Sequence, residues 1–93
     1  MLHNLGRVVA TAALAAAVLH HQITTLLDRH ARGDWGDLDS EDKAANDDAA
    51  RTGDGRLFSS YDTPDHGTIW IITNDIHGEG EGPITTVLFP DDY

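Results

Sequence analysis

Carboxylates and histidines are the residues of this 93-residue chain whose type and spacing could do chemistry. Eight of the sixteen Asp and Glu residues fall within residues 33–55, where only Lys43 and Arg51 oppose them. Carboxylates in such a concentration can bind a metal ion, act as a general acid and base, or present a negative surface to a basic partner. Each of these chemistries requires further groups at characteristic spacings.

Metal binding requires several ligands that converge, and the histidine pattern supports it weakly. The chain has six His and no Cys, and it contains neither an H-E-x-x-H motif nor a Cys/His knuckle. The side chains that come nearest to a ligand set are Asp62, Asp65, His66, Asp75 and His77. The sequence therefore predicts no metal site and no cofactor. A small metal-dependent nuclease or toxin-like enzyme is the alternative function.

Nucleophilic and acid–base catalysis have less support. Ser59 and Ser60 lie in a strand-like stretch with no glycine elbow, and there is no cysteine thiol. A pair of catalytic carboxylates needs a cleft that separates their pKa values, and a chain of this length offers little room for one. The glycine-rich residues 78–82 lack the lysine of a phosphate-binding loop. We predict no catalytic residues and a protein that is not an enzyme.

The formal net charge of −10 excludes several partners. A surface this acidic repels nucleic acid and anionic membranes and attracts basic protein surfaces. The six Lys and Arg residues form no run that could follow a phosphate backbone. We therefore expect a basic protein partner, with no direct nucleic-acid or membrane binding. The absence of cysteine suits a cytoplasmic protein.

The apolar residues 8–19 (VVATAALAAAVL) resemble the core of a secretory signal peptide. The stretch is too short to span a bilayer, and alanine dominates it. We interpret it as part of the fold, with a strand over residues 7–11 and a helix over residues 12–20. In a second helical pattern Ile23, Leu26, Leu27 and His30 share one face, and Gly33 ends it.

The carboxylate-rich stretch is itself predicted to be a helix. Asp39 is a favourable N-cap, Asp42 follows three residues later, and Gly53 closes the helix. Leu38, Ala45 and Ala49 share a narrow stripe that would face the core.

The second half of the chain reads as strands over residues 56–63, 67–75 and 84–90, joined by turns. Short connections between consecutive strands favour an antiparallel meander. The predicted fold is α+β in one domain, residues 1–93. Two or three N-terminal helices would pack on one face of a three- to four-stranded antiparallel sheet.

The order of these segments resembles a family of small proteins found on plasmids, phages and integrating elements, commonly labelled plasmid-related proteins. The resemblance covers nearly the whole chain, and its most specific part is RHARGDWGDLDSEDKAAND, residues 29–47. The glycine-rich residues 75–83 and the pair His20–His21 depart from the family pattern. The resemblance implies no catalytic residues. It implies a setting on mobile DNA, where small acidic proteins often block host defences.

These observations lead to one functional hypothesis. The acidic segment, residues 34–48, would mimic nucleic acid and bind the basic nucleic-acid site of a CRISPR effector or restriction nuclease. Its partner-binding residues would be Asp34, Trp35, Asp37, Asp39, Glu41, Asp42, Asp47 and Asp48. Two alternatives remain open: a solvated acidic face, and a Trp35 that plugs the core instead of anchoring an interface. In a third interpretation, an accessory protein self-associates through a sheet edge or apolar helix, giving a monomer or small homo-oligomer.

Overall fold

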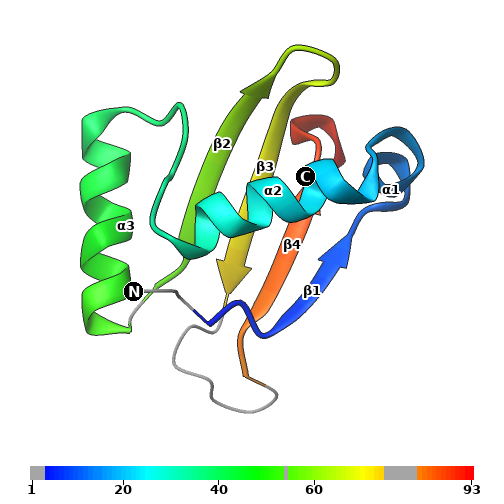
Figure 1. Ribbon diagram of the computed structural model, residues 1–93. Helices are drawn as coiled ribbons and strands as arrows, with labels where there is room; N and C mark the ends of the chain where they lie inside the picture. The colour runs from blue at the N-terminus through cyan, green and yellow to red at the C-terminus, as the bar shows by residue number, and fades with distance from the viewer. Residues whose placement is uncertain (1–3, 54, 75–81) are drawn as a thin grey trace.

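The computed structural model describes residues 4–53, 55–74 and 82–93. Within these residues, four strands, three α-helices and a short 3₁₀ helix follow one another (Figure 1). In order they are β1 (Arg7–Ala10), α1 (Ala12–Ala17), α2 (His20–Ala31), α3 (Ser40–Thr52), β2 (Leu57–Thr63), β3 (Gly67–Asn74), β4 (Ile84–Leu88) and η1 (Pro90–Asp92). The α+β class is therefore confirmed, whereas the helix expected over residues 12–20 ends at Ala17 and α2 begins at His20.

The sheet is mixed, with the strand order β1-β4-β3-β2. β2, β3 and β4 form the expected antiparallel meander, in which Ile71 lies opposite Ser59 on one side and Val87 on the other. β1 pairs with β4 in parallel, Arg7 opposite Ile84. The prediction of a purely antiparallel sheet was wrong for this strand. Since β1 leads into helices that cross the sheet, no hairpin dictates its direction.

The helices lie between β1 and β2 in the chain and occupy two different places (Figure 1). α2 crosses one face of the sheet, as predicted. α3 stands beside β2 at the edge of the sheet, so the prediction that all helices pack on one face was wrong. The helix buries only a few side chains, because its residues are mostly small and acidic and offer no broad apolar stripe.

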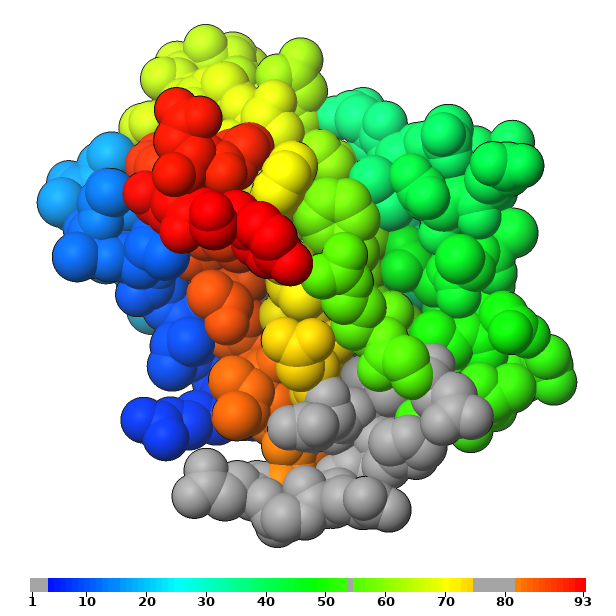
Figure 2. Space-filling view, turned by 180° about the vertical axis from the view of Figure 1, so that it is seen from behind, coloured from blue at the N-terminus to red at the C-terminus, as the bar shows by residue number. Residues whose placement is uncertain are grey.

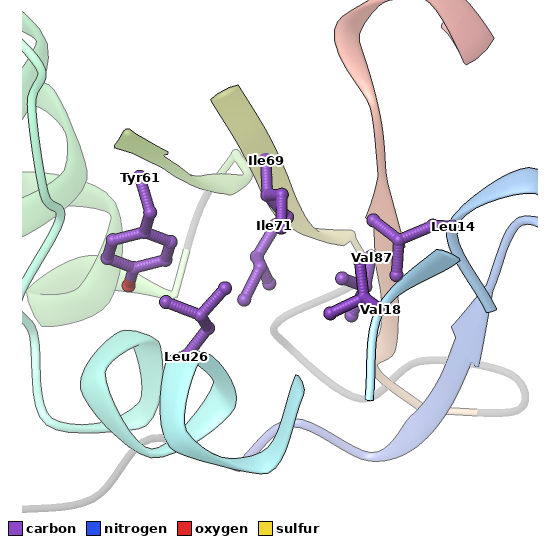
Figure 3. Close-up of a cluster of buried hydrophobic side chains, with 7 residues drawn as sticks. All are labelled: Leu14, Val18, Leu26, Tyr61, Ile69, Ile71 and Val87. Atoms are coloured by element: carbon purple, nitrogen blue, oxygen red, sulfur yellow. The ribbon is translucent and has the colours of Figure 1, made fainter. Parts of the chain in front are cut away.

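The main core lies between α1, α2 and the helix-facing side of the sheet (Figure 3). Leu14 of α1, Val18 between α1 and α2, and Leu26 of α2 pack against four side chains of the strands, which are Tyr61, Ile69, Ile71 and Val87. Odd-numbered residues of β2 and β3 point to this side because side chains alternate along a strand. On the predicted helix face, Leu26 and His30 are buried and Ile23 and Leu27 are half-buried.

No α-helix of the described residues lies on the opposite side of the sheet, where the strands are visible from behind with the C-terminal residues lying across them (Figure 2). Here the Trp70 ring meets Phe58 edge-on at 5.1 Å and Tyr93 at 5.9 Å between ring centroids. Arg56 donates a hydrogen bond to the Tyr93 hydroxyl. The aromatic rings therefore cover the side of the sheet that the helices leave open.

Candidate functional site

The acidic segment begins in a loop that is fastened to the edge strand β2. Gly33 leaves α2 with φ +83° and Gly36 has φ +77°, two positions that suit glycine. Between them the loop runs beside β2: Ser60 N–H donates to the Trp35 carbonyl, and Asp37 N–H donates to the Ser60 carbonyl at 2.7 Å. The loop is thereby held as a short extension of the sheet.

Trp35 is a structural residue of this loop. Its side chain is 3% exposed and packs with Ala49 and Leu57. Its indole N–H donates to the Asp47 carboxylate at 2.9 Å. The interpretation of Trp35 as a plug is confirmed. A side chain this buried presents almost no surface to a partner, so we exclude it from the candidate interface.

Helix α3 begins and ends where the sequence predicted. The Asp39 carboxylate accepts from Asp42 N–H at 2.8 Å, and Gly53 closes the helix with φ +78°. The predicted core stripe was wrong at Ala45, which is exposed, because Asn46 occupies the buried face beside Ala49.

Asn46 joins α3 to β2 through its amide. Its Nδ2 donates to the Phe58 carbonyl at 2.6 Å, and its Oδ1 accepts from Phe58 N–H at 3.0 Å. The side chain thus satisfies both backbone groups of an edge-strand residue. A search for apolar periodicity misses a buried asparagine. The burial of Asn46 could have been predicted from its position, three residues before Ala49 on the same helix face.

The seven carboxylates predicted to bind a partner are all exposed, and five of them are tied to the protein. Asp34 pairs with Arg29 at 2.6 Å, Asp37 accepts from Asp62 N–H at 2.8 Å, Asp39 caps α3, Asp47 binds Trp35, and Asp48 pairs with Arg51. Within the part of the chain that the structure describes, the side chains of Glu41 and Asp42 make no hydrogen bond or ion pair.

Charges around the loop are mutually stabilised. The hydrogen bond from Arg29 holds the pKa of the Asp34 carboxyl below its usual value, helped by Gly36 N–H and by the charge of Lys43. The same bond raises the pKa of Arg29. The Arg29 guanidinium also lies over the Tyr61 ring, 4.6 Å from its centroid. Asp34 therefore stays ionised within the cluster formed by Arg29, Asp34 and Tyr61.

Tyr61 anchors the cluster and gives a pH-dependent prediction. Its hydroxyl donates to the Asp34 carbonyl at 2.6 Å, and burial raises its pKa to about 12 from 10.0. Because the folded state holds this proton more tightly, the contribution of Tyr61 to the free energy of unfolding is fully present below pH 10 and is lost as the pH rises toward 12. The loss is at most about 2.7 kcal/mol. We expect an ultraviolet titration to show a phenol ionising near pH 12 that Tyr61→Phe removes. Ionisation of Tyr61 near pH 10 in the folded protein would contradict this assignment.

A buried polar network lies between α2 and the sheet. His30, which the sequence placed on the core-facing side, is fully buried and shares hydrogen bonds with Ser59 at 2.5 Å and Thr73 at 2.9 Å. Thr73 bonds to Thr85, whose hydroxyl donates to the Leu5 carbonyl. Ser59 beside His30 resembles a nucleophile with its base. Both side chains are 0% exposed, so no substrate reaches them and the pair serves to satisfy buried polar groups.

The side chains considered as metal ligands do not come together where the structure describes them. Asp62 and Asp65 are exposed, and His66 shares a 3.3 Å contact with Gln22. Asp75 and His77 lie outside the described residues. Among the described residues there is no group of three or more His, Asp or Glu side chains that could hold a metal ion. Nor does any helix in the described ranges have the length and apolar character to cross a membrane.

Comparisons with models of known families, with curated proteins and with solved structures give no match.

Proposed function

We propose that this protein is a non-enzymatic inhibitor that binds the basic nucleic-acid site of a host defence complex, a CRISPR effector or a restriction nuclease. The observation that carries the proposal is a set of exposed carboxylates held in place on a fastened loop and a capped helix. A surface that is already ordered avoids much of the entropy loss that a flexible acidic tail incurs on binding.

The spacing of the carboxylates supports nucleic-acid mimicry. α3 has 13 residues and is therefore about 20 Å long. Asp39, Glu41, Asp42, Asp47 and Asp48 lie along it, which is one carboxylate per about 4 Å, opposed by Lys43 and Arg51. One strand of DNA carries a phosphate every ~3.4 Å. The net charge of −10 would also accelerate the encounter with a basic groove.

The choice of a defence complex as the partner is supported by the resemblance to plasmid and phage proteins. Such complexes bind DNA or RNA through cationic grooves, which complement the acidic segment. They act in the cytoplasm, so we place this protein there as part of the proposal.

Charge reversal tests the proposed surface. Glu41→Lys, Asp42→Lys and Asp48→Lys together change carboxylates that have no role in holding Trp35 or capping α3. We expect this triple variant to keep the circular dichroism spectrum of the parent protein. Binding of the parent protein is measured by biolayer interferometry against a panel of CRISPR effectors and restriction nucleases. For the complex that the parent protein binds, the affinity of the triple variant should be at least ~100-fold lower. Binding by the parent protein should also weaken as salt rises.

A matched control separates a local surface from net charge. Asp28→Lys, Asp65→Lys and Asp91→Lys together make the same change in charge at exposed positions outside α3 and the acidic segment, and Asp28 has an exposed ion pair with Arg32 as Asp48 has with Arg51. We expect this control to lose affinity only modestly. Equal losses in both triple variants, or no loss in the first, would refute a binding role for the acidic segment.

A further inference from the structure

The negative charge is distributed unevenly along the chain. All sixteen Asp and Glu residues lie in residues 28–93, whereas residues 1–27 contain none and have Arg7 as their only Lys or Arg. The part of this stretch that the structure describes forms β1, α1 and the beginning of α2. The segment that forms β1 and α1 is thus nearly free of charge in an otherwise strongly acidic chain.

This segment also exposes apolar side chains. All four residues of β1 are exposed, with Val8 at 43% and Val9 at 37%, and Leu19 after α1 is 62% exposed. Among the described residues only Tyr93 is a further exposed large hydrophobic side chain. A hollow of about 490 Å³ beside β1 is lined partly by Val8, Val18 and Ile23. Apolar patches of this kind are typical of protein contact sites.

The two edges of the sheet differ in whether another segment pairs with them. The edge at β2 is closed by the loop that carries Trp35, through the hydrogen bonds at Ser60. At the β1 edge, no described segment pairs with the outer side of the strand. Proteins usually protect an edge strand with charge, proline or a bulge, and β1 has only Arg7 at its start.

The backbone directions identify which groups of β1 are free. Arg7 N–H donates to the Pro83 carbonyl at 3.0 Å, and Thr11 N–H donates to the Val87 carbonyl at 3.1 Å. Because directions alternate along a strand, the N–H and C=O groups of Arg7 and Val9 point to β4. Those of Val8 and Ala10 point away from the sheet, toward the open edge.

We propose that β1 pairs antiparallel with β1 of a second copy of this chain, about a two-fold axis at Val9. In this register Val8 and Ala10 of each copy exchange backbone hydrogen bonds with Ala10 and Val8 of the other. The two sheets then form one continuous sheet, and Val9 packs against its symmetry mate.

Charge favours a second copy as the occupant of this edge. Two acidic chains repel each other at most surfaces, and they can approach closely at the β1 edge, where residues 1–27 contribute no carboxylate. The register also places Arg7 of one copy opposite Thr11 of the other, and the Thr11 hydroxyl donates to the Asp92 carboxylate at 2.8 Å. Each copy would thus bring a guanidinium toward a carboxylate of its mate. α3 lies at the opposite edge, beside β2, and stays free in the dimer.

Sedimentation equilibrium and light scattering test this dimer. We expect the parent protein to have about twice the chain mass of 10.1 kDa. Val8→Pro removes an outward N–H without touching the bonds to β4, and Val9→Lys places like charges across the two-fold axis. Both variants should be monomers with the parent circular dichroism spectrum. Ala45→Lys adds the same charge at an exposed site on α3 and should remain a dimer.

A mass of 10.1 kDa for the parent protein from micromolar to millimolar concentration would overturn the proposal. So would a dimer that persists in Val9→Lys, which decides the question if Val8→Pro does not fold. The inference is independent of the proposed function. The variant with Glu41, Asp42 and Asp48 reversed should still dimerise, so the failure of one proposal is distinguishable from the failure of the other.

Discussion

Replacing His30 with alanine lowers the free energy of unfolding by about 3–5 kcal/mol, measured by urea denaturation. The side chain is 0% exposed, so its removal leaves a cavity between α2 and the sheet. It also removes the ring nitrogens that bond to Ser59 and Thr73. A domain of this size has a total stability of roughly 5–15 kcal/mol, so the variant should be close to unfolding.

Two further variants separate the causes of this loss. His30→Leu restores apolar volume but no hydrogen bond, so it should recover only part of the lost stability. His66→Ala is the matched control, because His66 is only half-buried and its ring shares a long hydrogen bond of 3.3 Å with Gln22. We expect it to cost less than about 1 kcal/mol. If His30→Ala also lowers the free energy of unfolding by less than about 1 kcal/mol, the buried network is not a determinant of the fold.

Replacing Gly36 with alanine costs at least about 3 kcal/mol and releases the loop from β2. At φ +77° a β-carbon is strained, and it would lie 2.1 Å from the Ser60 carbonyl oxygen and 2.7 Å from Tyr61 Cδ1. Neither neighbour can retreat easily, because the same carbonyl accepts from Asp37 N–H and the Tyr61 side chain is buried. Urea denaturation gives the loss, and the fluorescence of Trp35 reports the opening of the loop.

Gly67→Ala is the control for backbone strain alone. Gly67 has a similar φ of +69°, but a β-carbon there meets no atom within 4 Å. Its loss should be about 1–2 kcal/mol, the cost of the left-handed conformation. If the two alanine variants lose equal stability, the close approach of the loop to β2 contributes nothing.

Local signals in the sequence predicted the helices well. Asp39, Gly33 and Gly53 act through hydrogen bonds and dihedral angles within a few residues, so caps can be recognised without knowing the fold. The alternation in β2 and the apolar run in β3 likewise predicted the meander. The direction of β1 was not predictable in this way, because its partner β4 lies more than seventy residues away in the chain.

The roles of the carboxylates in the candidate site were not predictable for a similar reason. Counting charges identified the acidic segment, but the bonds of Asp37 to Asp62 and of Asp47 to Trp35 depend on tertiary contacts. They divide the carboxylates into those that hold the loop and those, such as Glu41 and Asp42, whose side chains face solvent. Asn46 and the hydroxyls around His30 were missed because polar residues give no periodic apolar signal.

Displacement of nucleic acid tests the central claim most directly. A fluorescent DNA or guide–target duplex is bound to the defence complex, and its release is followed as this protein is added. We predict competitive release that weakens with salt, is lost in the Glu41, Asp42 and Asp48 variant, and is retained in the Asp28, Asp65 and Asp91 control. Binding that leaves the nucleic acid in place, or equal release by both variants, would contradict it.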